Sequence, residues 1–438
     1  MAKKKRPSSL PGLILTAALL VAVAGIVLVR ASTQKQDAPA VTPSPAPAIS
    51  APADTAVPVI GPASATEAPA PTEAEPTAEP SPEPTPVPQP EYFTISMVGD
   101  CSMASNPDKK GWAIAYESVI NGDMSYPFAN TRQYFEDDYL TIANLEGVLS
   151  DNYYSSIEWF TFLSPASYAD ILTEGNVDFV TLANNHTLDF GEKAYNDTLA
   201  ALDAVGMAYA GENETYIYQT DDGLKIGIYC LYNRLTGNML KTMSSAAQTE
   251  LAEQSRQLIA QAEKALREQG AEYFIACLHM GTEGFYEPSE IQMEMCRYTI
   301  DTGFDLVYCT HAHRLQPVES YNGGVIFYGF GNWTFGGHTN PGNGTDPGAY
   351  DTVIGRVTVC RLGDQVTLEE LEVIPCCIAS VSDLENFVPN PGTLNDYQPT
   401  PYTEGGKAWE RTMSMVNGTY EGANYITDYG NVLAAMNG

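Results

Sequence analysis

Four of the five histidines in this chain lie in polar stretches that directly follow apolar, strand-like runs. His186 ends the stretch LANNH, His279 ends ACLH, and His311 and His313 lie in CTHAH. A single histidine at such a place is usually a hydrogen-bonded structural residue, and we interpret His338, in GGHTNPGNG, as an ordinary loop residue. Four histidines in the same kind of position favour a metal site, because imidazole is a good ligand for zinc, iron and manganese.

Oxygen ligands follow the earlier strand-like runs. Asp100 ends MVGD, Asn144 and Glu146 lie in IANLEG, and Asn184 and Asn185 lie in LANNH. Ligand sites in open α/β sheets lie beyond the carboxyl ends of the strands, so these side chains are expected to converge. Two cations about 3.5–4 Å apart need one shared carboxylate, and Glu146 is our candidate for it. The sequence contains no paired thiolates, which argues against a structural zinc site.

The elements that must position these residues alternate between strand-type and helix-type patterns. We expect strands at 91–99, 139–144, 177–183, 224–232, 272–278 and 304–309, and helices at 126–137, 165–175, 192–206, 246–270 and 289–303. Further strands are expected at 325–332, 349–362 and 365–375. This alternation predicts an α/β fold, and the late run of strands predicts a second sheet packed on the first.

The first ninety residues differ from the rest. Residues 1–9 carry a basic cluster, and residues 10–29 contain no charge. Because about 20 apolar residues cross a bilayer, we expect a single-pass membrane anchor with 1–9 in the cytoplasm and the later chain outside. A cleaved signal peptide is the alternative, but its apolar region is usually only about 7 to 15 residues long. Residues 30–90, rich in Pro, Ala, Thr and Glu, are expected to form a disordered linker. The folded domain should then span 91–390, with 391–438 as a polar tail or small cap.

The net charge limits the binding partners that this chain can have, and the cysteine positions indicate whether it contains disulfides. The formal net charge is −32, nearly all of it beyond residue 90, which excludes nucleic acid as a partner and requires cations for any polyanionic substrate. The eight cysteines are even in number, yet several lie inside apolar strand-like runs. We therefore expect buried thiols in place of a disulfide framework.

The ordered set GD, NLE, NNHxxDFG, HMGTE and HAHxxQPVE, within about residues 92–336, resembles the CapA family of capsule and poly-γ-glutamate synthesis proteins. That family belongs to the calcineurin-like metallophosphoesterase superfamily. The resemblance implies a four-layer αββα sandwich with two divalent ions, manganese, iron or zinc, at the strand ends. It further implies the following roles: Asp100 and His313 bind the first metal, Asn185, His279 and His311 bind the second, Glu146 bridges them, and His186 acts as general acid or orients the attacked group.

The sequence departs from the superfamily pattern in three places. The expected Asp-x-His is Asp100-Cys101-Ser102, so one histidine ligand is missing, and Met280 and CTHAH replace a common Trp and GHHPH. Further possible site residues are Asn144, Asn184, Asp189 and Glu283. Asp189 could orient His186 or cap the helix near Glu192, and capping is the favoured role.

Three functions fit these patterns. The first is an extracytoplasmic metal-dependent hydrolase, and the second is a non-catalytic accessory that handles an anionic poly-γ-glutamate or capsule polymer together with the capsule synthesis proteins. The third is a degenerate module that binds nothing. The missing histidine favours the second and third, whereas the pair Asn185 and His186 favours the first.

Overall fold

The computed structural model describes residues 88–105, 115–152, 154, 160–237, 241–336, 344–423, 425, 427 and 429. The predicted basic segment 1–9, the predicted anchor 10–29 and all but the end of the predicted linker 30–90 lie outside these residues, as does His338. Within the described residues, no helix combines the length and the apolar character that crossing a membrane requires.

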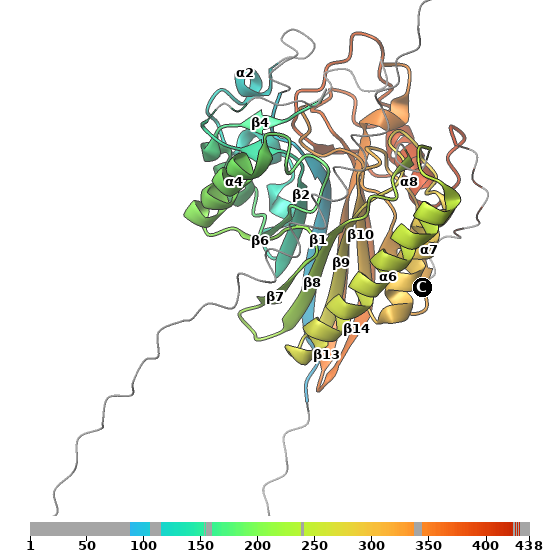
Figure 1. Ribbon diagram of the computed structural model, residues 1–438. Coiled ribbons are helices and arrows are strands. Elements are labelled where there is room, and N and C mark those ends of the chain that lie inside the picture. The colour runs from blue at the N-terminus through green and yellow to red at the C-terminus, as the bar shows by residue number, and fades with distance from the viewer. Residues whose placement is uncertain are drawn as a thin grey trace, which may run out of the picture. The chain divides into compact units, whose positions relative to one another are not determined.

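Two sheets form the centre of the domain (Figure 1). The first has the order β15-β14-β13-β1-β2-β5-β6, and the second has the order β11-β12-β10-β9-β8-β7. The strands of the first sheet are β1 (Glu91–Cys101), β2 (Leu140–Leu145), β5 (Phe179–Thr181), β6 (Ala208–Ala210), β13 (Asp351–Leu362), β14 (Gln365–Cys377) and β15 (Thr400–Pro401). Those of the second are β7 (Glu214–Gln219), β8 (Lys225–Tyr232), β9 (Tyr273–His279), β10 (Leu306–Thr310), β11 (Val318–Tyr321) and β12 (Gly324–Phe327). A small sheet joins β3 (Val148–Leu149) and β4 (Leu163–Ser164).

In both sheets the central strands run parallel and antiparallel strands lie beside them. Strands β1, β2, β5 and β6 pair in parallel, as do β8, β9, β10 and β12. The predicted α/β class is therefore confirmed. The late strands do not form the second sheet, however: β13 pairs antiparallel with β1, from Glu91↔Arg361 to Met97↔Gly355, and so extends the first sheet. The second sheet is built from β7 to β12.

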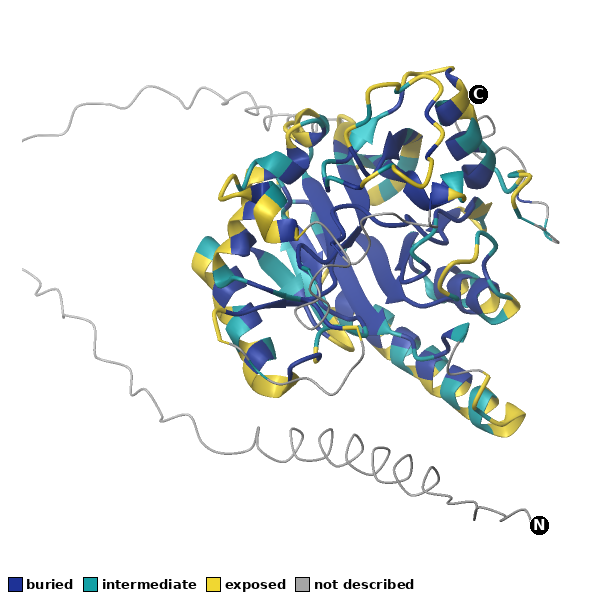
Figure 2. Cartoon of the chain, turned by 90° about the horizontal axis from the view of Figure 1, so that it is seen from above, coloured by how far each residue is buried: buried dark blue, intermediate teal, exposed yellow. Residues whose placement is uncertain are grey.

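Alternate side chains of each strand enter different cores. Met97 and Ile275 point into the core between the two sheets, whereas their neighbours Val98 and Ala276 point outward into helix-covered cores. This alternation follows from the period of two along a β-strand, and it explains why the central strands are apolar on both faces. Figure 2 shows the strands buried at the centre and the helices exposed on their outer sides.

Helices cover the outer faces of both sheets. The first sheet packs against α3 (Ala169–Glu174) and α4 (Gly191–Val205), and the second packs against α6 (Ser245–Glu268) and α7 (Glu290–Thr302). Ser289 caps α7 by accepting a hydrogen bond from the Gln292 N–H, and Gly206, with a φ of 72°, ends α4 in the left-handed region that glycine favours.

The helix predicted over 126–137 is wrong. The segment instead forms two short 3₁₀ turns, η1 (Tyr126–Phe128) and η2 (Arg132–Tyr134). Pro127 supplies no N–H, and the Asn130 side chain between the turns donates to Gln398 and Thr400 from the C-terminal part of the chain. Tertiary contacts here override the helix-type pattern.

Beyond residue 390 the chain forms a further helix, α8 (Lys407–Val416). Met413, Met415 and Val416 of this helix enter the core between the sheets. The Arg411 guanidinium donates two 2.7 Å hydrogen bonds to the buried carboxylate of Asp351, the first residue of β13. This buried ion pair fixes α8 to the first sheet. The remaining short elements are α2 (Tyr116–Ile120), η3 (Ala166–Tyr168) and η5 (Pro347–Tyr350).

All eight cysteines are free thiols, as predicted. Seven are buried and Cys360 is half-buried. The Sγ atoms of Cys296 on α7 and Cys309 on β10 lie 3.4 Å apart. These side chains therefore serve as small apolar groups of the cores.

Candidate metal centre

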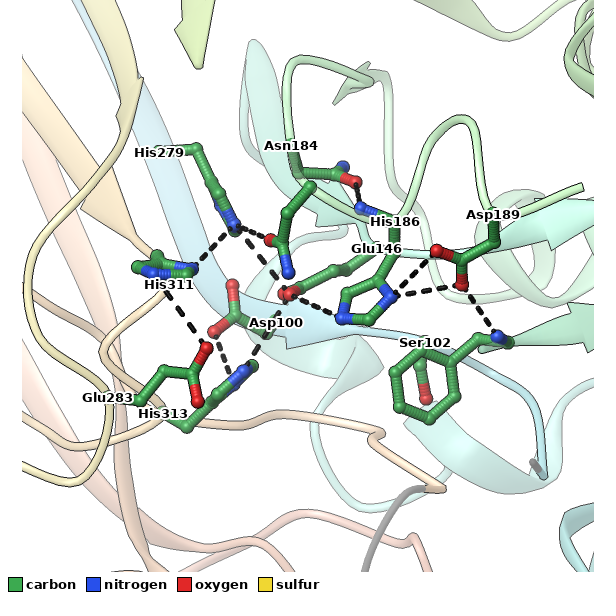
Figure 3. Close-up of polar contacts among 12 residues, drawn as sticks. Asp100, Ser102, Glu146, Asn184, His186, Asp189, His279, Glu283, His311 and His313 are labelled. Carbon is green, nitrogen blue, oxygen red and sulfur yellow. Dashed lines mark hydrogen bonds and ion pairs between the residues drawn. The ribbon is translucent and has the colours of Figure 1, made fainter. Parts of the chain in front are cut away.

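The carboxyl ends of four parallel strands bring the predicted ligands together (Figure 3). Asp100 lies at the end of β1, Glu146 follows β2, His279 ends β9, and His311 directly follows β10. Figure 3 shows these side chains and His313 turned toward one another around Glu146. The first sheet thus supplies the carboxylates and the second sheet supplies the imidazoles.

Two groups of donor atoms share Glu146. Glu146, His279 and His311 form one group, and Asp100, Glu146 and His313 form the other; within each group the ligand atoms lie within 4.8 Å of one another. Glu146 Oε1 is 3.7 Å from Nε2 of both His279 and His313. This is the arrangement that a carboxylate shared by two cations requires.

Asn185 belongs to the His279 side of the site. Its Oδ1 atom lies 2.6 Å from His279 Nε2, and His311 Nδ1 lies 3.1 Å from the same nitrogen. All six residues predicted as metal ligands therefore lie in one cluster. An amide oxygen adds a ligand there without adding another negative charge.

The carboxylates of the cluster fit cations. Glu146 Oε1 is buried, and no hydrogen-bond donor among the described residues satisfies it. Asp100 Oδ2 is also buried, and the group that faces it is the ring nitrogen Nδ1 of His313, at 3.1 Å. Burial, together with the charge of Asp100, raises the pKa of Glu146 well above its ordinary value. A buried carboxylate oxygen without a partner is unfavourable. Divalent cations would remove that penalty, so the donor set fits a metal pair.

The pKa values of two of the imidazoles also favour metal binding. Burial lowers the pKa of His279 well below its ordinary value and, with the nearby charge of His313, lowers the pKa of His311 to about 3. Both are therefore neutral at pH 7, as metal ligands must be. Burial also opposes charge on His313, but Asp100, with Oδ2 3.1 Å from His313 Nδ1, raises the pKa of His313 above its ordinary value.

Neighbouring groups fix which ring nitrogen faces the centre. Thr310 Oγ1 lies 2.8 Å from His279 Nδ1, and Asn332 Oδ1 lies 2.9 Å from His313 Nδ1. The Thr310 contact holds His279 Nδ1 and leaves its Nε2 directed at Glu146. In His313, Nδ1 also faces Asp100 Oδ2 at 3.1 Å, while Nε2 faces Glu146 Oε1 at 3.7 Å. His311 and His313 have φ values of 95° and 50°, so the loop places its two imidazoles by adopting a backbone that few non-glycine residues use.

Asn144 and Asn184 support the carboxylates from behind. Asn144 Nδ2 donates to Asp100 Oδ1 at 2.8 Å and to Glu146 Oε2 at 3.2 Å, and its Oδ1 accepts from Asn184 Nδ2 at 3.0 Å. Each carboxylate therefore has one oxygen held by Asn144 and the other directed into the cluster. These two asparagines orient ligands and are not themselves in the two donor groups.

His186 lies beside the cluster, held by Asp189. Its Nδ1 atom is 2.9 and 3.1 Å from the two Asp189 oxygens, and its Nε2 atom is 3.9 Å from Glu146 Oε1. Asp189 also accepts a hydrogen bond from the Phe162 N–H. The favoured capping role for Asp189 is wrong, because α4 begins at Gly191 without a side-chain cap.

The remaining site predictions fall at the margin. Glu283 is exposed, and its Oε1 atom lies 3.9 Å from His311 Nε2. Ser102, where the resemblance led us to expect a histidine, is buried and accepts a hydrogen bond from the Gly336 N–H, so it holds the backbone in place. Sequence reasoning missed Thr310 and Asn332, although Thr310 directly precedes His311 and Asn332 ends one of the expected strands.

The close approach of two backbones sets the position of Asp100. The Asp100 N–H donates to Gly331 O at 3.0 Å, and the Trp333 N–H donates to Asp100 O at 2.9 Å. A Cβ atom at Gly99 would collide with Gly331 O, so glycine is required there. The segment that carries Asn332 is thereby fixed against the end of β1.

Comparisons with known proteins identify a family and several relatives. The family model described as bacterial capsule synthesis protein PGA_cap matches residues 94–336. The capsule biosynthesis protein CapA of Bacillus anthracis is 25% identical over 257 residues, which are 56% of this chain and 60% of the relative. The PGA biosynthesis protein CapA of Bacillus subtilis is 29% identical over 174 residues, 38% of this chain and 44% of the relative.

More distant similarity extends to two further proteins. A probable polyglutamine synthesis accessory protein of Mycobacterium tuberculosis is 24% identical over 165 residues, 34% of this chain and 43% of the relative. This chain thus spans less than two thirds of each of these three relatives. Among solved structures, the calcineurin-like phosphoesterase YfkN from Bacillus subtilis aligns with a TM-score of 0.39 and 11% identity, covering 66% of this chain and 91% of that one.

Proposed function

This chain belongs to the PGA_cap family of bacterial capsule synthesis proteins, and we propose that it is a dinuclear metal-dependent hydrolase acting in capsule or poly-γ-glutamate synthesis or export. Its substrate is a phosphodiester or a γ-glutamyl polymer. The two donor groups that share Glu146 carry this proposal. The two facing sheets with helices outside them support assignment to the four-layer αββα sandwich of calcineurin-like phosphoesterases.

The chain's residues divide between two divalent cations of manganese, iron or zinc. Asp100 and His313 hold one, Asn185, His279 and His311 hold the other, and Glu146 holds both. Cations in such a pair supply positive charge that polarises the attacked group and stabilises the anionic transition state. The chain's part is to hold the carboxylate, amide and imidazole ligands in fixed positions in a mostly buried site.

His186 is the proposed proton donor. Asp189 accepts a hydrogen bond from His186 Nδ1 and so fixes the orientation of the ring, while Nε2 faces Glu146 and the centre. A proton on Nε2 can pass to the leaving group as its bond breaks. The edge of the Phe162 ring, with its centroid 4.7 Å from that of His186, restricts the imidazole further.

We also propose the cellular setting. Residues 10–29 anchor the protein in the cell membrane, and the folded domain lies outside the cytoplasm, where it meets a capsule polymer and its synthesis proteins. A non-catalytic accessory that binds an anionic polymer through its cations is the second candidate, and Ser102 favours it. Ser102 replaces a histidine ligand, and its Oγ atom is engaged with Gly336.

Metal analysis combined with hydrolysis assays tests the proposal on the full chain. We expect about two transition-metal ions per chain, and loss of at least one in His279→Ala or His313→Ala. His186→Ala should retain the ions and lose hydrolysis of a phosphodiester or γ-glutamyl substrate. A chain purified without chelators that contains no metal contradicts both candidates, and unchanged turnover in His186→Ala removes that residue from the mechanism.

A further inference from the structure

Two arginines flank the candidate centre on the second sheet. Strands β8, β9 and β10 are parallel neighbours, and His279 ends the middle one. Arg234 follows the end of β8 by two residues, and Arg314 follows the end of β10 by four. Neighbouring strands lie about 4.8 Å apart, so the chain leaves β8 and β10 at points about 10 Å apart, on opposite sides of His279.

Arg314 is close to the centre and only partly neutralised. It directly follows His313, and its Nη1 atom donates to the His313 carbonyl at 2.9 Å. Its Nη2 atom reaches Asp346 Oδ2 at 3.3 Å, but the other Asp346 oxygen accepts from the Tyr286 hydroxyl, so that carboxylate is shared. The Arg314 Nε atom is buried without an acceptor among the described residues. The charge of Arg314 is therefore balanced by one shared carboxylate.

Two other half-buried arginines are paired more completely. Arg411 makes two 2.7 Å hydrogen bonds to Asp351, and Arg297 makes two, of 3.0 and 2.6 Å, to Glu319. Such two-pronged geometry is the strong form of an arginine–carboxylate pair. The single 3.3 Å contact of Arg314 is weak by comparison, so an incoming anion can compete with Asp346.

Arg234 is also only partly neutralised. Among the residues that the structure describes, no carboxylate lies within ion-pair distance of Arg234, although its charge interacts with Glu212 and opposes the rise that desolvation causes in the pKa of Glu212. Its guanidinium carbon lies 5.3 Å from the centroid of the Tyr232 ring, and that ring lies edge-on to His279 with centroids 5.7 Å apart. Tyr232 thus places a cationic group one aromatic ring away from a proposed metal ligand.

The acidic composition of the chain makes the positions of Arg234 and Arg314 informative about the ligand. In a chain with a formal net charge of −32, most arginines are needed to neutralise carboxylates. Two guanidinium groups whose charges are only partly neutralised, beside a cation site, instead favour anions on both sides of that site. A planar guanidinium matches the two oxygens of a carboxylate.

We propose that Arg234 and Arg314 bind two carboxylates of one acidic chain that crosses the metal centre along the row of strand ends. This inference rests on the proposed function for the centre itself and assigns its substrate a direction.

Binding of γ-glutamate oligomers to the manganese-loaded full chain tests the inference. The ligands are a hexamer, a dimer, and a neutral hexamer whose free carboxylates are amides. Arg234→Gln and Arg314→Gln should each weaken hexamer binding about tenfold, which corresponds to about 1.4 kcal/mol. Neither change should affect the neutral hexamer, and the affinity gain from dimer to hexamer should vanish in the double variant.

Arg256→Gln is the matched control, because Arg256 is a partly exposed residue of α6 that pairs with Glu294 at 3.6 Å. Metal content and thermal unfolding verify each fold, and Arg314→Lys should recover part of the lost affinity. Equal hexamer binding by wild type and both variants overturns the inference, as does an equal loss in Arg256→Gln. Arginine-dependent binding of inorganic phosphate that is tighter than hexamer binding also overturns the carboxylate assignment.

The test separates this inference from the proposed hydrolase. Arginine-dependent hexamer binding without any turnover supports the two arginines and contradicts the hydrolase. Metal-dependent turnover with arginine-independent hexamer binding supports the hydrolase and contradicts the role of the arginines.

Discussion

Replacement of Glu146 by glutamine should have opposite effects on stability with and without metal. Glu146 is fully buried, no donor among the described residues bonds its Oε1 atom, and the Asp100 carboxylate is nearby. An unsatisfied buried polar group costs about 1–3 kcal/mol. Glutamine has the same shape and carries no charge beside Asp100. The metal-free variant should therefore be about 1–3 kcal/mol more stable than the metal-free wild type.

Metal should reverse that order. A cation at about 1,000 times its dissociation constant stabilises a folded chain by about 4 kcal/mol per site. Glu146 belongs to both donor groups, so Glu146→Gln weakens both sites. With saturating Mn²⁺ the wild type should become the more stable protein by several kcal/mol.

The pH dependence of the metal-free proteins has a definite sign. The pKa of Glu146 is raised in the folded state, so its protonated form is favoured there, and stability falls as pH rises through that pKa. Glutamine does not titrate. The advantage of metal-free Glu146→Gln should therefore be largest at alkaline pH and shrink as the solution becomes more acidic.

Urea unfolding of the full chain, after chelation and after reloading with Mn²⁺, measures both effects. Glu283→Gln is the control, because Glu283 is exposed and lies 3.9 Å from His311 at the margin of the site. It should change stability by less than about 0.5 kcal/mol in either state. A Glu146→Gln protein that is less stable than wild type in both states would refute the reasoning that the buried Glu146 carboxyl group destabilises the metal-free protein and that cations stabilise it.

Three further changes follow from contacts in the structure. Burial raises the pKa of Asp178 to about 6, so its ionised form disfavours folding above that pH. Asp178→Asn should therefore raise the free energy of unfolding by at most roughly 3 kcal/mol at pH 7.5, and by progressively less toward pH 4. Chemical denaturation measures this change. Arg411→Met leaves the Asp351 carboxylate buried without its partner and should lower unfolding free energy by about 3–5 kcal/mol, with partial recovery in the Arg411→Met/Asp351→Asn double variant. Asp189→Asn removes the carboxylate that orients His186 and should reduce turnover about 10- to 100-fold at unchanged metal content; loss of metal instead would assign Asp189 to the metal sites.

The sequence predicted those parts of the fold that local patterns determine. Apolar runs gave the central strands, and Gly206 and Gly303 marked the ends of two helices, because both end in a left-handed conformation. The six expected ligands could be found because each follows a strand, and parallel strands end on the same side of a sheet.

What the sequence did not reveal depends on contacts between distant segments. The pairing of β13 with β1 joins residues more than two hundred positions apart, and no local signal distinguishes it from a separate late sheet. Asn332 could not be identified as the partner of His313 before the β1 end was known to pack against Gly331. For Asp189, a turn before a helix favoured capping, but the carboxylate contacts the His186 ring and the Phe162 backbone instead.

The division of ligands between the sheets links metal binding to the packing of the domain. Glu146 follows a strand of the first sheet, whereas His279 and His313 follow strands of the second. Cations shared through Glu146 therefore connect the two sheets at one edge, above the apolar core that joins their inner faces. A sliding motion of one sheet over the other would separate ligands of both donor groups, so each bound cation resists that motion. Metal binding and sheet packing should consequently stabilise one another, because each depends on the same relative placement of β2 and β9.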